Sequence, residues 1–165
     1  MLECLIMGDS IAVGTKMFAP TECVSYSKGG YNTWQWNKRW GGTPLEAKTV
    51  VISLGTNDHK CVNTFKEQSK VRYRIRSVKV VWIVPPCNSG FCKPKVNAIV
   101  KQIAAQYNDV TISTSYVQPD KIHPSWRGYK DLVKKSGIWH EWDGNRDSGI
   151  YGTDSMSRSS GRTVP

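Results

Sequence analysis

The sequence lacks any apolar run of the roughly 18 residues that a transmembrane helix requires, so it predicts no membrane span. Its first residues, MLECLIMGDS, have neither the basic region nor the apolar length of a secretory signal peptide. Their apolar residues are better interpreted as a first strand. We therefore expect synthesis in the cytoplasm, which is compatible with action on a virion or a cell surface.

Acidic residues are few: 13 Asp and Glu stand against 23 Lys and Arg, for a net charge of +10. Such a charge suggests nucleic acid as a first hypothesis. However, the basic residues are scattered along the chain, and none of the recognised nucleic-acid-binding motifs is present. We do not expect nucleic acid as a partner, because an anionic polysaccharide or a cell envelope suits the charge at least as well.

The five cysteines and three histidines predict neither a complete disulfide framework nor a metal site. The five cysteines are an odd number, which argues against a complete disulfide framework. Cys87 and Cys92 bracket a short turn and could pair in an oxidising compartment, but free thiols are the expectation for a chain made in the cytoplasm. The three histidines are dispersed and lack the ligand spacing of zinc sites. We expect neither a metal nor a cofactor.

At 165 residues the chain is long enough for one domain. Short runs rich in Val, Ile and Leu predict buried strands at Glu3–Met7, Thr49–Leu54, Lys79–Val84 and Val110–Ser113, with a weaker one at Glu22–Tyr26. Helices are predicted over 94–107 and Trp126–Lys135, with a crossover helix within the ambiguous segment Asn63–Arg76. Alternating strands and helices indicate an α/β fold, a three-layer α/β/α sandwich around a parallel sheet.

The composition changes near Gly137. Residues 137–165 are rich in Gly, Ser, Asp and Arg, so we divide the chain into a domain over 1–136 and a polar extension over 137–165. The extension is either flexible or a docking segment for an assembly partner, with Trp139, Trp142 and Tyr151 as anchors.

Polar segments follow the predicted strands where the carboxyl ends of a parallel sheet would meet, which is where such sheets place their active sites. These segments are Gly8-Asp9-Ser10, Lys28-Gly29-Gly30, Gly55-Thr56-Asn57-Asp58 and Asp120-Lys121-Ile122-His123-Pro124. Each string alone is a common turn or capping sequence. Their occurrence together, each after a predicted strand, predicts one site.

The residue types in these segments suit acyl transfer. A serine hydroxyl needs a base to become a nucleophile, and His123 could serve Ser10 in this role. Asp120 could hold the His123 ring in the correct tautomer and stabilise its protonated form. Gly30 and Asn57 could donate hydrogen bonds to a developing oxyanion, together with the backbone N–H of Ser10 at a helix start.

These same segments resemble the four sequence blocks of the SGNH hydrolases, also called GDSL-type esterases. The resemblance spans roughly residues 3–136 and includes Gly128-Tyr129 after the last block. In the second block Gly29 competes with Gly30, and Ile11 stands where the family commonly has Leu. The Gly-x-Ser-x-Gly elbow of the α/β-hydrolases is absent, which argues against that other fold.

The resemblance implies a flavodoxin-like sheet of five parallel strands and a metal-free mechanism. It also implies Ser10 as nucleophile, His123 as base, Asp120 as its orienting acid, and Ser10, Gly30 and Asn57 as the oxyanion hole. The family cleaves carboxylic esters of acetylated sugars, lysophospholipids and simple alcohols, as well as some thioesters, and a few members transfer acyl groups to sugars.

Four aromatic residues follow Gly30 within the segment Tyr31–Trp40. Sugars stack on such rings, so Tyr31 and Trp34 are candidate substrate-binding residues, although some of these tryptophans could instead pack on the sheet. We expect an O-acetyl esterase that acts on a carbohydrate. The alternatives are a lysophospholipase or thioesterase, and a phage or virion module that binds without catalysis.

Overall fold

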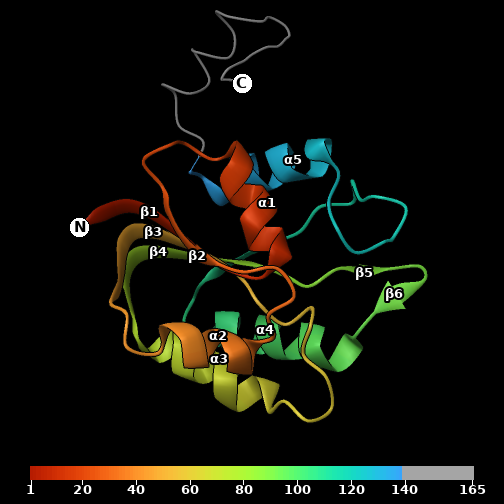
Figure 1. Ribbon diagram of the computed structural model, residues 1–165, viewed down its shortest axis with the longest axis horizontal. Helices are drawn as coiled ribbons and strands as arrows, with labels where there is room; N and C mark the ends of the chain where they lie inside the picture. Colours follow the sequence, from red (N-terminus) through yellow and green to blue (C-terminus); the bar gives the residue numbers. More distant parts are fainter. Residues whose placement is uncertain (139–165) are drawn as a thin grey trace, which may run out of the picture.

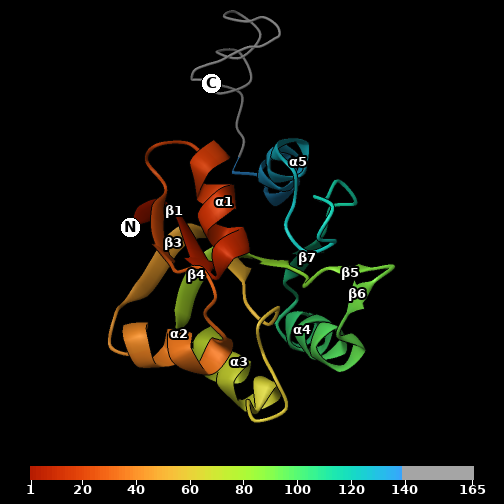
Figure 2. The ribbon, with the colours of Figure 1, turned by 45° about the vertical axis from the view of Figure 1, so that its right-hand side comes forward.

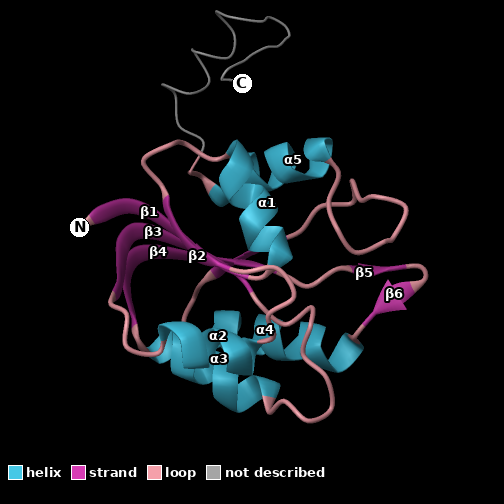
Figure 3. Cartoon of the chain, viewed as in Figure 1, coloured by secondary structure: helices cyan, strands magenta, loops and turns pink. Residues whose placement is uncertain are grey.

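The structure is a computed structural model that describes residues 1–138. Figure 1 shows a central sheet between two layers of helices, and Figure 3 separates helices, strands and loops by colour. The strands of the sheet are β1 (Leu2–Gly8), β2 (Val24–Ser27), β3 (Leu45–Ser53), β4 (Ile75–Ile83) and β7 (Val110–Ile112). The helices are α1 (Ser10–Phe18), α2 (Thr33–Trp40), α3 (Thr64–Tyr73), α4 (Pro94–Gln106) and α5 (Trp126–Ser136). A small hairpin consists of β5 (Cys87–Asn88) and β6 (Phe91–Cys92).

The five strands pair in the order β2-β1-β3-β4-β7, and every pair is parallel. This is the flavodoxin-like order, so the predicted three-layer α/β/α fold is confirmed. The register aligns Gly8 of β1 with Ser27 of β2 and with Ser53 of β3. Because these strands end level with one another, the segments that follow them converge at one edge of the sheet.

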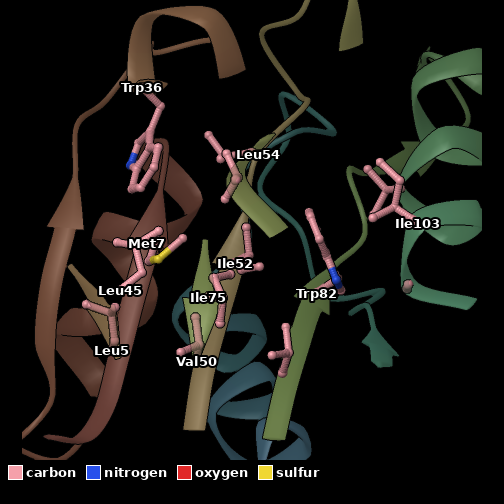
Figure 4. Close-up of a cluster of buried hydrophobic side chains, with 14 of the residues drawn as sticks. Leu5, Met7, Trp36, Leu45, Val50, Ile52, Leu54, Ile75, Trp82 and Ile103 are labelled. Atoms are coloured by element: carbon pink, nitrogen blue, oxygen red, sulfur yellow. The ribbon is translucent and has the colours of Figure 1, made fainter. Parts of the chain in front are cut away.

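Each face of the sheet is covered by its own set of helices. Helices α2, α3 and α4 cover one face, and α1 and α5 cover the other (Figures 1 and 2). Figure 4 shows how Trp36 of α2 and Ile103 of α4 meet the side chains of β1, β3 and β4. On the opposite face, Ile11 of α1 and Leu132 of α5 pack against the sheet. Both layers therefore hold β1 rigidly, and Ser10 follows that strand.

Strands β3 and β4 each begin four residues before the predicted runs. The first half of β3 alternates buried Leu45 and Ala47 with exposed Glu46 and Lys48, a pattern that a search for continuous apolar runs does not detect. The ambiguous segment 63–76 is a helix followed by a strand: α3 ends at Tyr73 and β4 starts at Ile75. The strand-like alternation in this segment therefore spans the boundary between α3 and β4.

The expectation of free thiols is wrong for four of the five cysteines. Cys87 is bonded to Cys92, which closes the hairpin, and Cys4 of β1 is bonded to Cys23, just before the neighbouring strand β2. Cys61 is free and exposed. The Cys4–Cys23 pair could not be foreseen from spacing, because their proximity depends on the pairing of β1 with β2.

Within residues 1–138, none of the helices combines the length and the apolar character needed to cross a bilayer. The predicted anchors Trp139, Trp142 and Tyr151, with the rest of residues 139–165, lie outside the described part of the chain. The division into a domain and an extension therefore stays a prediction.

Candidate active site

The predicted site residues lie at the carboxyl edge of the sheet, where the loops after β1, β2, β3 and β7 meet. Gly8 has a φ of +140°, and a Cβ added to it would lie 1.8 Å from the carbonyl oxygen of Ser53. Only glycine fits this turn. Asp9 then caps α1, since its Oδ1 accepts a hydrogen bond from the N–H of Ile11 at 3.0 Å. Ser10 is thereby fixed as the first residue of the helix.

The loop before α5 holds the acid and the base. One carboxylate oxygen, Oδ1 of Asp120, accepts two backbone hydrogen bonds in this turn, from the N–H of Ile122 at 2.8 Å and from the N–H of His123 at 2.9 Å. The loop is closed at its base by a bond of 2.7 Å from the N–H of Gln118 to the carbonyl of His123. This arrangement leaves Oδ2 of Asp120 free to face the imidazole.

A continuous chain of hydrogen bonds links the three predicted catalytic side chains. Ser10 Oγ lies 2.9 Å from His123 Nε2, and His123 Nδ1 lies 2.7 Å from Asp120 Oδ2. Bonding to His123, followed by the two backbone N–H groups, lowers the pKa of Asp120 to about 2. The Asp120 side chain is 44% exposed and that of His123 is 37% exposed, so solvent reaches the pair. Such a chain of bonds can transfer a proton from a serine hydroxyl to an imidazole.

The two other predicted donors lie in the loops that follow β2 and β3, at the same edge of the sheet. Gly30 has a φ of +82° and occupies the third position of a turn closed by the N–H of Tyr31 and the carbonyl of Lys28. The Asn57 Nδ2 donates one hydrogen bond to the Tyr31 carbonyl at 3.0 Å, which joins the loops that bear Gly30 and Asn57. Since an amide nitrogen carries two hydrogens, Asn57 keeps a second one for a ligand.

Comparisons with known proteins find no matching family model and no matching curated protein. Solved structures do match. A protein from Bacteroides fragilis that is predicted to be an acylhydrolase superposes with a TM-score of 0.58 and 19% identity over 83% of this chain and 86% of that one. A predicted GDSL-like lipase from Parabacteroides merdae gives 0.59 and 14% over 86% and 94%. The catalytic domain of peptidoglycan O-acetyltransferase A from Streptococcus pneumoniae, in a structure with a methylsulfonyl adduct, gives 0.56 and 17% over 87% and 94%.

The chain has the SGNH hydrolase fold. At these identities the likeness establishes the fold alone, and the chemistry of the site must be argued from this chain's own residues. The fold agrees with the one implied by the four sequence blocks.

Within this SGNH hydrolase fold, the Gly55–Asp58 loop is held by a buried polar network that sequence reasoning missed. The Asp58 carboxylate accepts bonds from the N–H and hydroxyl of Thr33 at the start of α2, and from the hydroxyl of Thr64 at the start of α3. The only available signal was the Asp that follows Asn57. Its carboxylate fixes the loop, while Asn57 itself stays partly exposed.

The structure separates the two candidate substrate-binding aromatics. Trp34 is 49% exposed at the first turn of α2, with the Lys38 ammonium 5.4 Å from its ring centroid. Tyr31 is partly buried, with its ring 6.0 Å from that of Trp40. Trp36 is fully buried. Trp34 is therefore the more accessible ring, and the remaining aromatics of this segment pack largely on the sheet.

A cavity of about 440 Å³ lies at the carboxyl ends of β4 and β7, and none of the three proposed catalytic side chains lines it. Its wall includes Ile11 and Ile122, the chain neighbours of Ser10 and His123. The hydroxyl-bearing segment Ser113–Ser115 and the amide of Asn88 form another part of the wall. The volume falls in the range of small-molecule sites, and its mixed lining suits a ligand with both apolar and hydroxyl groups.

Asp9 is a buried carboxyl whose Oδ2 has no hydrogen-bond partner among the described residues. Burial raises its pKa from the ordinary 3.8 to about 7. Between these two values the folded chain holds a proton that the unfolded chain has released. Stability contributed by this group is therefore present at acid pH and decreases as the pH rises toward 7.

We expect the Asp9→Asn variant to lack this pH dependence, because an amide still caps α1 but does not titrate. The free energy of unfolding of the wild type should fall relative to that of the variant by roughly 4 kcal/mol between pH 4 and 8. Urea unfolding of both proteins at several pH values measures the difference. A difference that stays constant with pH would show that Asp9 is ionised in the folded chain throughout.

Proposed function

We propose that this chain is a serine esterase that hydrolyses carboxylic esters of short acyl groups, acting best on O-acetyl groups of a carbohydrate. The observation that carries the proposal is the unbroken chain of hydrogen bonds from Ser10 through His123 to Asp120 at the carboxyl edge of the sheet. The likeness to acylhydrolase and lipase structures supports the general class, an acyl ester hydrolase.

In the proposed first step, Ser10 Oγ attacks the ester carbonyl carbon and transfers its proton to His123 Nε2. The carbonyl oxygen becomes an oxyanion that accepts hydrogen bonds from the N–H groups of Ser10 and Gly30 and from the Asn57 amide. The intermediate collapses, the C–O bond to the alcohol breaks, and His123 returns the proton to the departing alcohol. An acyl-Ser10 ester remains.

In the second step, His123 removes a proton from a water molecule, and the resulting hydroxide attacks the acyl-Ser10 carbonyl. Collapse of this intermediate breaks the bond to Ser10 Oγ, which takes back the proton from His123. The products are the carboxylic acid and the free serine. Asp120 stays ionised throughout, stabilises the positive charge on His123 in both steps and keeps the Nδ1 hydrogen pointing toward itself.

Three features favour a carbohydrate as the alcohol. Trp34 offers an exposed ring beside a lysine, close in sequence to Gly30. The cavity next to Ile11 and Ile122 presents hydroxyl and amide groups that match those of a sugar. The net charge of +10 would attract an acidic polysaccharide. The similarity of fold to a peptidoglycan O-acetyltransferase domain adds support, since that protein handles acetyl groups on a glycan.

A series of p-nitrophenyl esters from acetate to octanoate tests the acyl preference. We expect kcat/KM to be highest for acetate and to fall with each added pair of methylenes. Acetylated polysaccharides, assayed by release of acetate, then test the alcohol. Turnover of lysophospholipids or long acyl esters without turnover of acetylated glycans would replace this proposal with a lipase or thioesterase. Failure on every substrate would favour a binding module.

The two disulfides bear on where the enzyme acts. Disulfides persist in oxidising surroundings and are rare where thiol reductants are abundant. Four paired cysteines therefore support action outside a reducing compartment, such as at a cell or virion surface.

A further inference from the structure

The hairpin β5–β6 lies between the two halves of the proposed site. Its strands pair Cys87 with Cys92 and Asn88 with Phe91, and the disulfide joins the first of these pairs. Figures 1 and 2 show it between α4 and the long loop that leads into α5. None of its residues belongs to the four sequence blocks or takes part in the proposed catalytic steps, although Asn88 lines the cavity described above.

One end of the hairpin contacts the loop that bears Asn57. Lys93, the residue after Cys92, donates two hydrogen bonds from its Nζ, to the carbonyl of Thr56 and to the carbonyl of Asp58, both at 2.9 Å. These two carbonyls stand on either side of Asn57 in the chain. The ammonium group thereby holds the Thr56–Asn57 peptide unit, which leads into Asn57, and the Asp58–His59 unit, which lies one residue beyond it.

The sequence explains why Lys93 reaches this loop. Lys93 precedes Pro94, the first residue of α4, and a residue before proline is held away from helical angles. Its φ is −116° and its ψ is 86°. The Lys93 side chain makes no capping bond to α4 and extends to the Gly55–Asp58 loop instead.

The other side of the hairpin contacts the loop that bears Asp120 and His123. Asn88 Nδ2 donates a hydrogen bond of 2.9 Å to the carbonyl of Lys121. Lys121 has a φ of +66°, an uncommon value for a residue other than glycine, and it lies between the acid and the base. The amide of Asn88 thus binds the turn at the residue with the positive φ.

From these contacts we infer that Lys93 is a positioning residue for the oxyanion hole, acting through Asn57, and that the disulfide-bonded hairpin anchors it relative to the His123 loop. This inference rests on the proposed esterase function. Lys93 holds the donor in place before substrate binds, so its effect belongs to the transition state rather than to substrate affinity.

We expect Lys93→Met to lower kcat about tenfold and to change KM less than about twofold. Loss of one oxyanion-hole donor lowers kcat about 10²–10³-fold, and a misplaced donor should lose part of that effect. Lys93→Arg should recover most of the loss, since a guanidinium can also donate to two carbonyls. Arg74→Met is the matched control. Arg74 likewise donates to two backbone carbonyls, those of Trp40 and Thr43, but just before β4, at the opposite end of the sheet. It should lower stability without lowering kcat.

A double-mutant cycle decides whether Lys93 acts through Asn57. Asn57→Ala alone should lower kcat by about 10²–10³-fold. If Lys93 only positions Asn57, then Lys93→Met should cause no further loss in the Asn57→Ala background. Equal tenfold losses in both backgrounds would show that Lys93 acts independently of Asn57 and would overturn the inference.

Hydrogen exchange separates failure of this inference from failure of the proposed function. Mass spectrometry of wild type and Lys93→Met should show faster amide exchange in the peptide covering Thr56–Asp58, with the sheet unchanged. Inactivity of the wild type on all esters would reject the esterase function. Hydrogen exchange would then test only whether Lys93 holds the Thr56–Asp58 loop. Unchanged exchange in this peptide, or unchanged kcat in an active enzyme, would overturn the role of Lys93.

Discussion

Replacing Ser10 with Ala is expected to abolish ester hydrolysis, with kcat lowered by about 10⁶-fold, the scale set by loss of the nucleophile in serine hydrolases. The change removes only the oxygen that attacks the ester. Alanine is a good residue for the first turn of a helix, so α1 should form unchanged. Gly8, Asp9 and the backbone N–H of residue 10 would remain in place, which makes loss of activity specific to the hydroxyl.

The measurement is hydrolysis of p-nitrophenyl acetate by both proteins, with circular dichroism to show equal folding. Ser77→Ala is a control, since the Ser77 hydroxyl on β4 bonds, within the described residues, to backbone groups of β4 and of the neighbouring strand. A sulfonyl or phosphonyl fluoride should add to the wild type at Ser10 and not to the Ala variant. Residual activity of the Ala variant within tenfold of the wild type would assign the nucleophile to another residue.

Asp120→Asn should reduce kcat by up to about 10⁴-fold while leaving the loop intact. The amide oxygen can accept the N–H groups of Ile122 and His123, as Oδ1 of Asp120 does. The amide nitrogen would then face His123 Nδ1 as a donor. This forces the imidazole hydrogen onto Nε2, where it faces Ser10 and cannot accept the serine proton.

A matched aspartate control separates this explanation from a general effect of removing a carboxylate. Because the pKa of Asp120 is lowered to about 2, its carboxylate stays charged at any pH above about 4, and it adds no titration to the activity profile there. Asp131→Asn is a suitable control, since Asp131 is also an ion-paired aspartate with a lowered pKa, on α5. A loss below tenfold for Asp120→Asn would make Asp120 a structural turn residue.

The parallel sheet and the proposed catalytic positions could be predicted from sequence for related reasons. Buried parallel strands must be apolar on both faces, so β1 and the later halves of β3 and β4 show clearly as hydrophobic runs. Active-site residues in such folds follow the strands, so the search could be confined to a few short segments. Gly8 and Gly55 marked the turns, and both have positive φ values.

The features that could not be predicted depend on contacts between distant parts of the chain. The sequence analysis does not predict helix α2, although Asn32 and Gln35 form a capping box, because its tryptophans also suit a substrate-binding segment. The bonds of Lys93 and of Asp58 join segments brought together only by the folded sheet. Nothing in the local sequence distinguishes Lys93 from the other lysines of a basic protein.

The hydrogen bond between Ser10 and His123 spans 113 positions of the sequence. A ribosome therefore releases the nucleophile early and its base only after the fourth and fifth strands of the sheet have emerged. A nascent or prematurely terminated chain carries Ser10 without its proton acceptor, and such a fragment cannot complete the proposed reaction. Competence in the proposed hydrolysis thus coincides with completion of the tertiary structure.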